Sequence, residues 1–360
     1  MKRIVTTFMF ALVAFAFMGG QLQAQFTTTF AKNATPGQQN GIYYSLPQTM
    51  LRLDFIIDEI QMEKGPLSDY ASNYLDMADV VEYETTEYKL IDVEMTPVSS
   101  PDPNALFFVT LATGRGSGKV QFDVMPNGVI RSAGVGVVVE GEMPFTKAEE
   151  PNCCREKTEP NYDFINLLSA GKSNAQLAKE AADKIEEIRK EKFYLIRGDV
   201  ATAYDPVTFD AMYQKLDEME KEYTSLLIGK RVAKRVVKSV YVVPTKEVPT
   251  QTVAKFSETQ GLTLGTSGSG STITVQTLSL NTTATINGPS QSAVESMSYE
   301  NKLFYRMPEM AQVTVTCGNK TLLEDRVSVN QLGALLMAPL TNTRLVFDTE
   351  TGQIINIRMQ

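Results

Sequence analysis

The chain lacks the side chain on which most hydrolytic and many metal sites depend. Its 360 residues include no histidine, which removes Ser-His-Asp and Cys-His nucleophiles and His-ligated zinc or copper. Acid–base chemistry at neutral pH would need a carboxylate, a lysine or a tyrosine with a displaced pKa. We find no convincing cluster of such residues, so we expect no catalytic residue, no metal site and no cofactor.

Three cysteines are the other reactive side chains. Cys153 and Cys154 are adjacent, and adjacent cysteines rarely bond to each other because the ring is strained. In an oxidising compartment one of them, such as Cys154, would be able to bridge to Cys317 and leave an odd thiol. The alternative is that all three are reduced and at least one is buried.

Two further motifs have ordinary structural explanations. The tripeptide Arg197-Gly198-Asp199 matches a receptor-adhesion motif, but arginine is also favourable at a helix end and glycine stops a helix. We expect the helix-ending role. The glycine-rich stretch at 113–120 lacks a glycine and a Ser or Thr that a phosphate-binding loop requires, so we expect a hairpin there.

The first residues follow the three-part pattern of a secretory signal peptide. Lys2 and Arg3 precede an apolar run from Phe8 to Met18, and the small residue Ala24 follows. A run of about 11 apolar residues is too short for the ~30 Å hydrocarbon layer of a membrane. We expect residues 1–24 to be removed and the remainder to be exported without a transmembrane segment.

The composition is that of an acidic folded protein. Hydrophobic residues make up 43% and charged residues 21%, and the formal net charge is −8. Nucleic-acid binders show the opposite charge balance, so we expect no nucleic-acid partner. The basic run Arg231, Lys234, Arg235 and Lys238 is interpreted as a solvated strand face, with anionic lipid headgroups or lipopolysaccharide as the alternative partner.

Hydrophobic periodicity predicts strands near both ends of the chain and helices between them. Residues 25–155 form the expected N-terminal β-rich domain, with a short helix near 66–77, and 231–360 the C-terminal one. Between them, 161–229 has apolar residues three or four apart in two segments. The expected fold class is α+β, with two mostly antiparallel β regions separated by a long antiparallel helical hairpin.

One short phrase occurs twice. Tyr44-Ser45-Leu46-Pro47-Gln48 aligns with Tyr305-Arg306-Met307-Pro308-Glu309, and each copy is followed by a hairpin glycine, Gly128 or Gly352. Proline is tolerated at a strand's start or edge but not in the middle of a sheet. We interpret the phrase as the start of a strand in two similar β modules, with chance similarity between hairpins as the alternative.

Four stretches carry a family resemblance: "GIYYSLPQTMLRLDF", "GPLSDYASNYL", "LDEMEKEYTSLLIGK" and "LFYRMPEMAQVTV…DRVSVNQLGAL". In their order and spacing they resemble the DUF4831 family of Bacteroidota envelope proteins, over nearly the whole mature chain. The resemblance implies a Gram-negative periplasmic or cell-surface location. It implies no activity.

We therefore expect an exported, non-catalytic envelope protein with a structural, binding or assembly role, periplasmic or secreted to the cell surface. Its expected partners are envelope proteins or glycans. One alternative is a hydrolase of cell-wall or glycan material, which would need two carboxyl groups about 5–10 Å apart. Another is an adhesin that acts through Arg197, Gly198 and Asp199.

The disulfide alternative makes a direct prediction. If Cys154 bonds to Cys317, mass mapping of the unreduced protein will yield a linked peptide that contains Cys317 and separates on reduction. If no peptide linked through Cys317 is found, the bridge is absent.

Overall fold

In the computed structural model, the described residues are 26–35, 40–75, 80–111, 120–135, 163–168, 170–198, 205–340 and 343–359. The expected signal peptide, Cys153, Cys154, Asp199 and all but the last residue of the glycine-rich stretch at 113–120 lie outside them. Among the described residues, no helix has the combined length and apolar character that a bilayer span requires.

The described residues build three sheets in which all strand pairs are antiparallel. The first sheet has the order β10-β1-β3-β2-β6. Its strands are β1 (Phe26–Phe30), β2 (Gly41–Glu63), β3 (Thr85–Leu111), β6 (Lys230–Val242) and β10 (Ser298–Glu300).

The second and third sheets are built from hairpins. The second has the order β12-β11-β9-β7-β8, with strands β7 (Thr250–Ser257), β8 (Gly261–Leu264), β9 (Ser271–Ser279), β11 (Lys302–Cys317) and β12 (Lys320–Pro339). The third has the order β14-β13-β5-β4, with strands β4 (Val120–Val124), β5 (Ile130–Val135), β13 (Thr343–Phe347) and β14 (Ile354–Met359).

The expected fold class is wrong. Instead of two separate β regions on either side of a helical segment, the first and third sheets each combine strands from both ends of the chain. In the first sheet Thr28 of β1 lies opposite Tyr299 of β10, and in the third Ala133 of β5 lies opposite Leu345 of β13. Alternating hydrophobicity shows which face of a strand is buried, but it does not show which strand lies beside it.

Two hydrophobic clusters hold the sheets together. The first and second sheets pack face to face, with Leu53 and Phe55 of β2 in one cluster with Val275 and Val313. A second cluster joins β1, the third sheet and the start of β11, where the ring of Phe107 stacks on that of Phe304 with centroids 4.5 Å apart. Burial of these apolar side chains is the main stabilising contribution.

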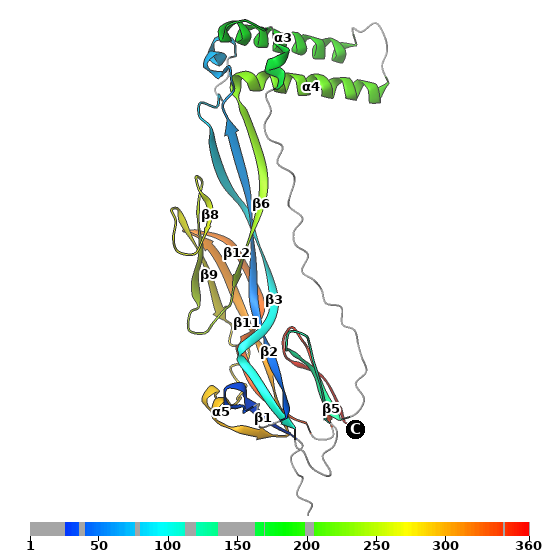
Figure 1. Ribbon diagram of the computed structural model, residues 1–360, viewed down its shortest axis with the longest axis vertical. Coiled ribbons are helices and arrows are strands. Elements are labelled where there is room, and N and C mark those ends of the chain that lie inside the picture. The colour runs from blue at the N-terminus through cyan, green and yellow to red at the C-terminus, as the bar shows by residue number, and fades with distance from the viewer. Residues whose placement is uncertain are drawn as a thin grey trace, which may run out of the picture.

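Beyond the second sheet, β2, β3 and β6 continue as a three-stranded ribbon (Figure 1). The side chains of β2 are mostly buried as far as Ile57 and half-buried after it. Asp58 receives two hydrogen bonds from Arg235, at 2.8 and 3.2 Å, and the hydrogen bond from Arg235 is the main reason why the pKa of Asp58 is lowered. Lys234 lies opposite Glu59 in register. These positions of the basic run therefore face acids on the neighbouring strand.

Two helices lie across the far end of this ribbon (Figure 1). They are α3 (Asn174–Arg197) and α4 (Pro206–Ile228), and they pack side by side over a third hydrophobic cluster. Asp205 caps α4 by accepting a hydrogen bond from the amide of Thr208 at 3.0 Å. The other helical segments among the described residues are short: η1 (Ala31–Asn33), η2 (Ser68–Tyr70), α2 (Ala71–Tyr74), η3 (Asp163–Leu167) and α5 (Gln291–Ser296).

A charged layer interrupts the apolar contact between α3 and α4. Lys192 occupies a buried position on α3, and its Nζ lies 2.8 Å from both Asp217 and Glu220 of α4. The hydrogen bonds from Lys192 and Lys221 lower the pKa of Asp217 to about 2. A buried charge that is matched in only one alignment fixes the register of two helices.

We expect Lys192→Met to change the free energy of unfolding at neutral pH by about 1 kcal/mol or less, because each of its two carboxylate partners keeps a second cation and neither charge is left uncompensated. Asp217 then retains Lys221, and Glu220 retains Arg189. A depressed carboxyl pKa contributes stability that is lost as the pH falls from 3.8 to about 2. Without Lys192 the pKa of Asp217 is lowered less. The variant should therefore lose less helix than the wild type as the pH falls from 3.8 to about 2.

Urea unfolding followed by far-UV circular dichroism measures both effects. The control is Lys190→Met, at an exposed position of α3, which should leave the acid dependence unchanged. Unfolding of the helices of Lys192→Met at neutral pH would contradict this account.

Candidate functional site

Two long hairpins, β2–β3 and β11–β12, share an irregularity at the duplicated phrase. In the first, the paired positions step from Ser45↔Leu106 to Pro47↔Pro101, so residues 102–105 of β3 bulge out of the ladder. In the second, they step from Met307↔Ala334 to Glu309↔Val329, so residues 330–333 of β12 bulge out. The prolines therefore mark bulges within continuous strands and not the starts of strands.

The likeness extends to the short hairpins that follow. The amide of Ser45 donates to the carbonyl of Gly128 at 2.8 Å, and the amide of Arg306 donates to the carbonyl of Gly352 at 3.1 Å. Ser45 and Arg306 occupy the same place in the two phrases, and both glycines have positive φ. The predicted similarity of the two β modules is confirmed by these contacts.

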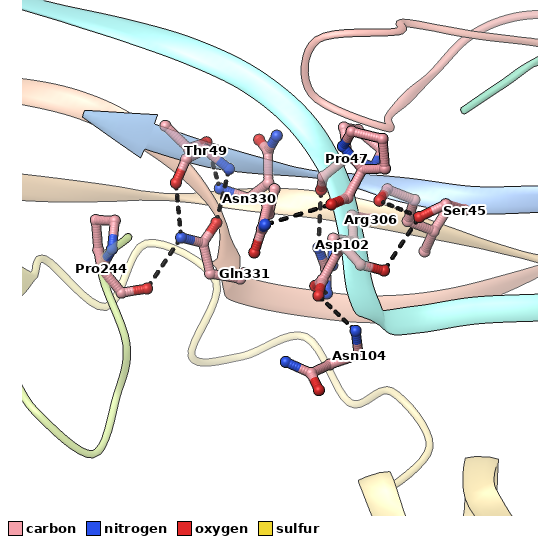
Figure 2. Close-up of polar contacts among 12 residues, drawn as sticks. Ser45, Pro47, Thr49, Asp102, Asn104, Pro244, Arg306, Asn330 and Gln331 are labelled. Atoms are coloured by element: carbon pink, nitrogen blue, oxygen red, sulfur yellow. Dashed lines mark hydrogen bonds and ion pairs between the residues drawn. The ribbon is translucent and has the colours of Figure 1, made fainter. Parts of the chain in front are cut away.

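The two bulges meet in one buried polar junction (Figure 2). The guanidinium of Arg306 on β11 donates to the carbonyl of Pro47 at 2.8 Å and to Oδ2 of Asp102 at 2.5 Å. Oδ1 of Asp102 accepts the amide of Asn104 at 2.8 Å. The side chain of Asp102 is only 3% exposed and that of Arg306 11%. A charge-assisted contact in such surroundings is strong, and its partners are tightly positioned.

The bulge of β12 completes the junction (Figure 2). Gln331 accepts the amide of Thr49 at 2.9 Å and donates to the carbonyls of Thr49 and Pro244, both at 2.9 Å. The amide of Asn330 donates to Oγ1 of Thr49 at 3.1 Å. These bonds connect both hairpins to the segment after β6.

A cavity of about 570 Å³ opens over this junction. Asp102, Arg306 and Gln331 line it together with the aromatic rings of Phe30 and Phe107. Charged residues of both signs also line it: Lys32, Lys246, Glu247 and Glu295. A pocket with this mixture of aromatic and polar walls suits a polar ligand better than a purely apolar one.

A second cavity of about 460 Å³ shares part of this lining, including Thr245 and Lys246. Glu309 lies in its wall and is almost completely buried. Burial alone would raise the pKa of Glu309, but hydrogen bonds from the hydroxyls and amides of Thr283 and Thr282 outweigh it and lower the pKa to about 2. Glu309 is therefore ionised at neutral pH and cannot supply a proton to a substrate there.

The sequence motifs lie elsewhere. Arg197 ends α3, and Gly198 follows with φ of 75° and donates its amide to the carbonyl of Leu195. That is the expected helix-ending geometry, while adhesion through the tripeptide stays a prediction. Cys317 is half-buried at the end of β11, burial raises the pKa of its thiol, and it forms no disulfide with another described residue. Because Cys153 and Cys154 are not among those residues, the bridge also stays a prediction.

The residues of the junction were missed as site residues. The phrase places Arg306 and Glu309 in the otherwise apolar stretch 303–311, and a charged residue at such a position is rarely buried unless it has a partner. That signal was available from the sequence. Asp102, Asn330 and Gln331 carried no comparable signal, because they lie in segments rich in polar residues.

We expect Arg306→Met to lower the free energy of unfolding by roughly 3–5 kcal/mol, because Asp102 would keep a buried charge without its cation. Adding Asp102→Asn to that variant should restore much of the loss. Urea unfolding measures all of these changes. Arg326→Met, on the exposed part of β12, is the matched control. If Arg326→Met lowered the free energy of unfolding as much as Arg306→Met does, the role of the ion pair would be contradicted.

The chain was compared with known protein families, curated proteins and solved structures. A family model described as a domain of unknown function (DUF4831) matches residues 40–355. No curated protein matches, and no solved structure matches.

Proposed function

Since the chain belongs to the DUF4831 family, whose description assigns no function, we propose that it is an exported, non-catalytic envelope protein with a binding or assembly role. The signal-peptide pattern of residues 1–24 supports export. A Gram-negative periplasmic or cell-surface location is the location proposed with it. Its partners would be envelope proteins or glycans.

The observation that carries the proposal is the position of α3 and α4. The two main hydrophobic clusters lie within the sheets, whereas the helices have a cluster of their own at the end of the β2, β3 and β6 ribbon (Figure 1). A ribbon that extends beyond the packed sheets adds little to the core. Its effect is to hold the helices away from the body, where a large partner can reach them.

The helices present a suitable contact surface near the end of α3. Phe193, Tyr194 and Ile196 are 55%, 45% and 63% exposed, and the guanidinium of Arg197 lies 5.3 Å from the centre of the Phe193 ring. Large apolar side chains grouped on a surface mark contact sites, and aromatic residues and arginine are enriched in protein interfaces. A partner protein would bury these side chains.

The hydrolase alternative has less support. The buried carboxylate of Asp102 is held by Arg306 and by the amide of Asn104. Glu309 is held by hydrogen bonds from two threonines. A catalytic pair would need one carboxyl group that can give up a proton and one that can accept it.

Crosslinking in intact cells tests this proposal. A photoreactive phenylalanine analogue in place of Tyr194 should form crosslinks to envelope components, because that side chain would lie within the contact. The same analogue in place of Val248, which is equally exposed at 50% but lies on the loop before β7, should form few. The mature protein should begin near Gln25 and fractionate with the envelope. Retention in the cytoplasm, or hydrolysis of envelope glycans by the purified protein, would overturn the proposal.

A further inference from the structure

The third sheet contains one hairpin design used twice. In β4–β5 the pairing shifts between Asp123 and Val124, and in β13–β14 it shifts between Val346 and Phe347, at the same distance from the turn. The paired strands of the two hairpins therefore correspond residue by residue, although the turn of the second hairpin is one residue longer. β13 corresponds to β4, and β14 corresponds to β5.

The two hairpins are joined head to tail. The second strand of the first hairpin, β5, pairs with the first strand of the second, β13. The paired positions are Ser132↔Val346, Ala133↔Leu345 and Gly134↔Arg344. A symmetric arrangement would instead have paired corresponding strands. The junction uses the second strand of one hairpin and the first strand of the other. It therefore leaves a first strand, β4, and a second strand, β14, without a partner in such a junction.

β14 and β4 are the two strands that would be needed to form a second junction like the one between β5 and β13. Among the strands that the structure describes, β4 and β14 end the third sheet, and neither has a second neighbour. β14 corresponds to β5, and β4 corresponds to β13. An edge strand with free backbone donors and acceptors is a template for pairing with another chain.

A row of apolar side chains crosses the four strands of the third sheet and reaches the β14 edge. One row of directly opposed positions contains only apolar residues: Phe122, Ala133, Leu345 and Ile357. Ala133 and Leu345 are buried, whereas Ile357 at the edge is 59% exposed and its neighbour Ile355 is 60% exposed. An apolar row that ends in an exposed isoleucine is the kind of edge that natural sheets usually protect with charge or a bulge.

We propose that β14 of one protomer pairs antiparallel with β4 of a second copy and repeats the β5–β13 junction. In that register Ile357 lies opposite Phe122 of the second copy and extends the apolar row. β14 carries Arg358 and no acid. β4 carries Asp123, whose carboxylate already accepts hydrogen bonds from Arg131 of β5 at 2.7 and 3.0 Å. Arg358 stands where β5 has Gly134, and it would lie diagonal to Asp123, within reach of a long side chain.

The interaction is heterologous, so it would build rings or open chains of copies. It deepens the assembly role proposed above and rests on it. The third sheet would run on from copy to copy, with the helices of each copy on the outside.

Sedimentation velocity of the mature, full-length chain over a concentration series tests the contact. The wild type should show species larger than a monomer that increase with concentration. Ile357→Lys should shift the midpoint of association to at least tenfold higher concentration, because it places a charge in the apolar row. Ile91→Lys, at an exposed isoleucine of β3 outside the third sheet, should behave as the wild type. Circular dichroism confirms that each variant is folded.

A cysteine pair tests the register. With the native cysteines changed to serine, Arg358→Cys combined with Gln121→Cys should give a ladder of oxidised oligomers, because the two positions lie opposite one another in the proposed pairing. Ile357→Cys combined with Gln121→Cys should not, because neighbouring residues of a strand point to opposite faces. A wild type that stays monomeric at all concentrations, or equal ladders from both pairs, would overturn the inference. If the protein is monomeric but still forms crosslinks from position 194 in cells, the proposed function stands and only the proposed pairing of β14 with β4 is rejected.

Discussion

The ion pair between Arg306 and Asp102 is the contact on which the arrangement of the sheets depends. It joins β11 to the bulge of β3, and the same guanidinium reaches the carbonyl of Pro47 on β2. Three strands from two sheets therefore meet at one buried cation. Removal of either charge would leave the other without compensation in a poorly solvated site, so the pair fixes where the second hairpin crosses the first. Gln331 and Thr49 extend the same polar contact along β12.

The consequence of this junction is a molecule with two distinct parts. On the side of the junction away from the helices, stacked aromatic rings such as those of Phe107 and Phe304 fill the space between the sheets. Above the second sheet, the ribbon relies on contacts between neighbouring strands, such as Arg235 with Asp58, because its side chains are only half-buried. The helices at its end have a separate apolar cluster and a charged layer at Lys192. The ribbon therefore buries less side-chain surface than the packed sheets do.

Local features could be predicted from the sequence more readily than the arrangement of the strands. The β-rich character and the family were predictable, and the proline phrase located two equivalent places in the fold. The prediction that the phrase starts a strand is wrong, since Pro47 and Pro308 lie inside long strands at bulges. The pairing of β1 with β10 was beyond reach, because strand alternation carries no information about a partner so distant in sequence. Lys192 lay in an apolar stripe, and only its two carboxylate partners on α4 explain why it is tolerated there.

The first sheet has a consequence for the order of folding. Thr28 of β1 donates a side-chain hydrogen bond to the carbonyl of Lys302, 274 residues further along. A chain that emerges from its N-terminus onward cannot complete this sheet until nearly all of it has been made. Distant pairings form slowly, and open strand edges invite aggregation meanwhile. The edge of β1 that pairs with β10 stays open until then, while its other edge can already pair with β3. A chaperone that shields the open edge would therefore benefit the newly made polypeptide.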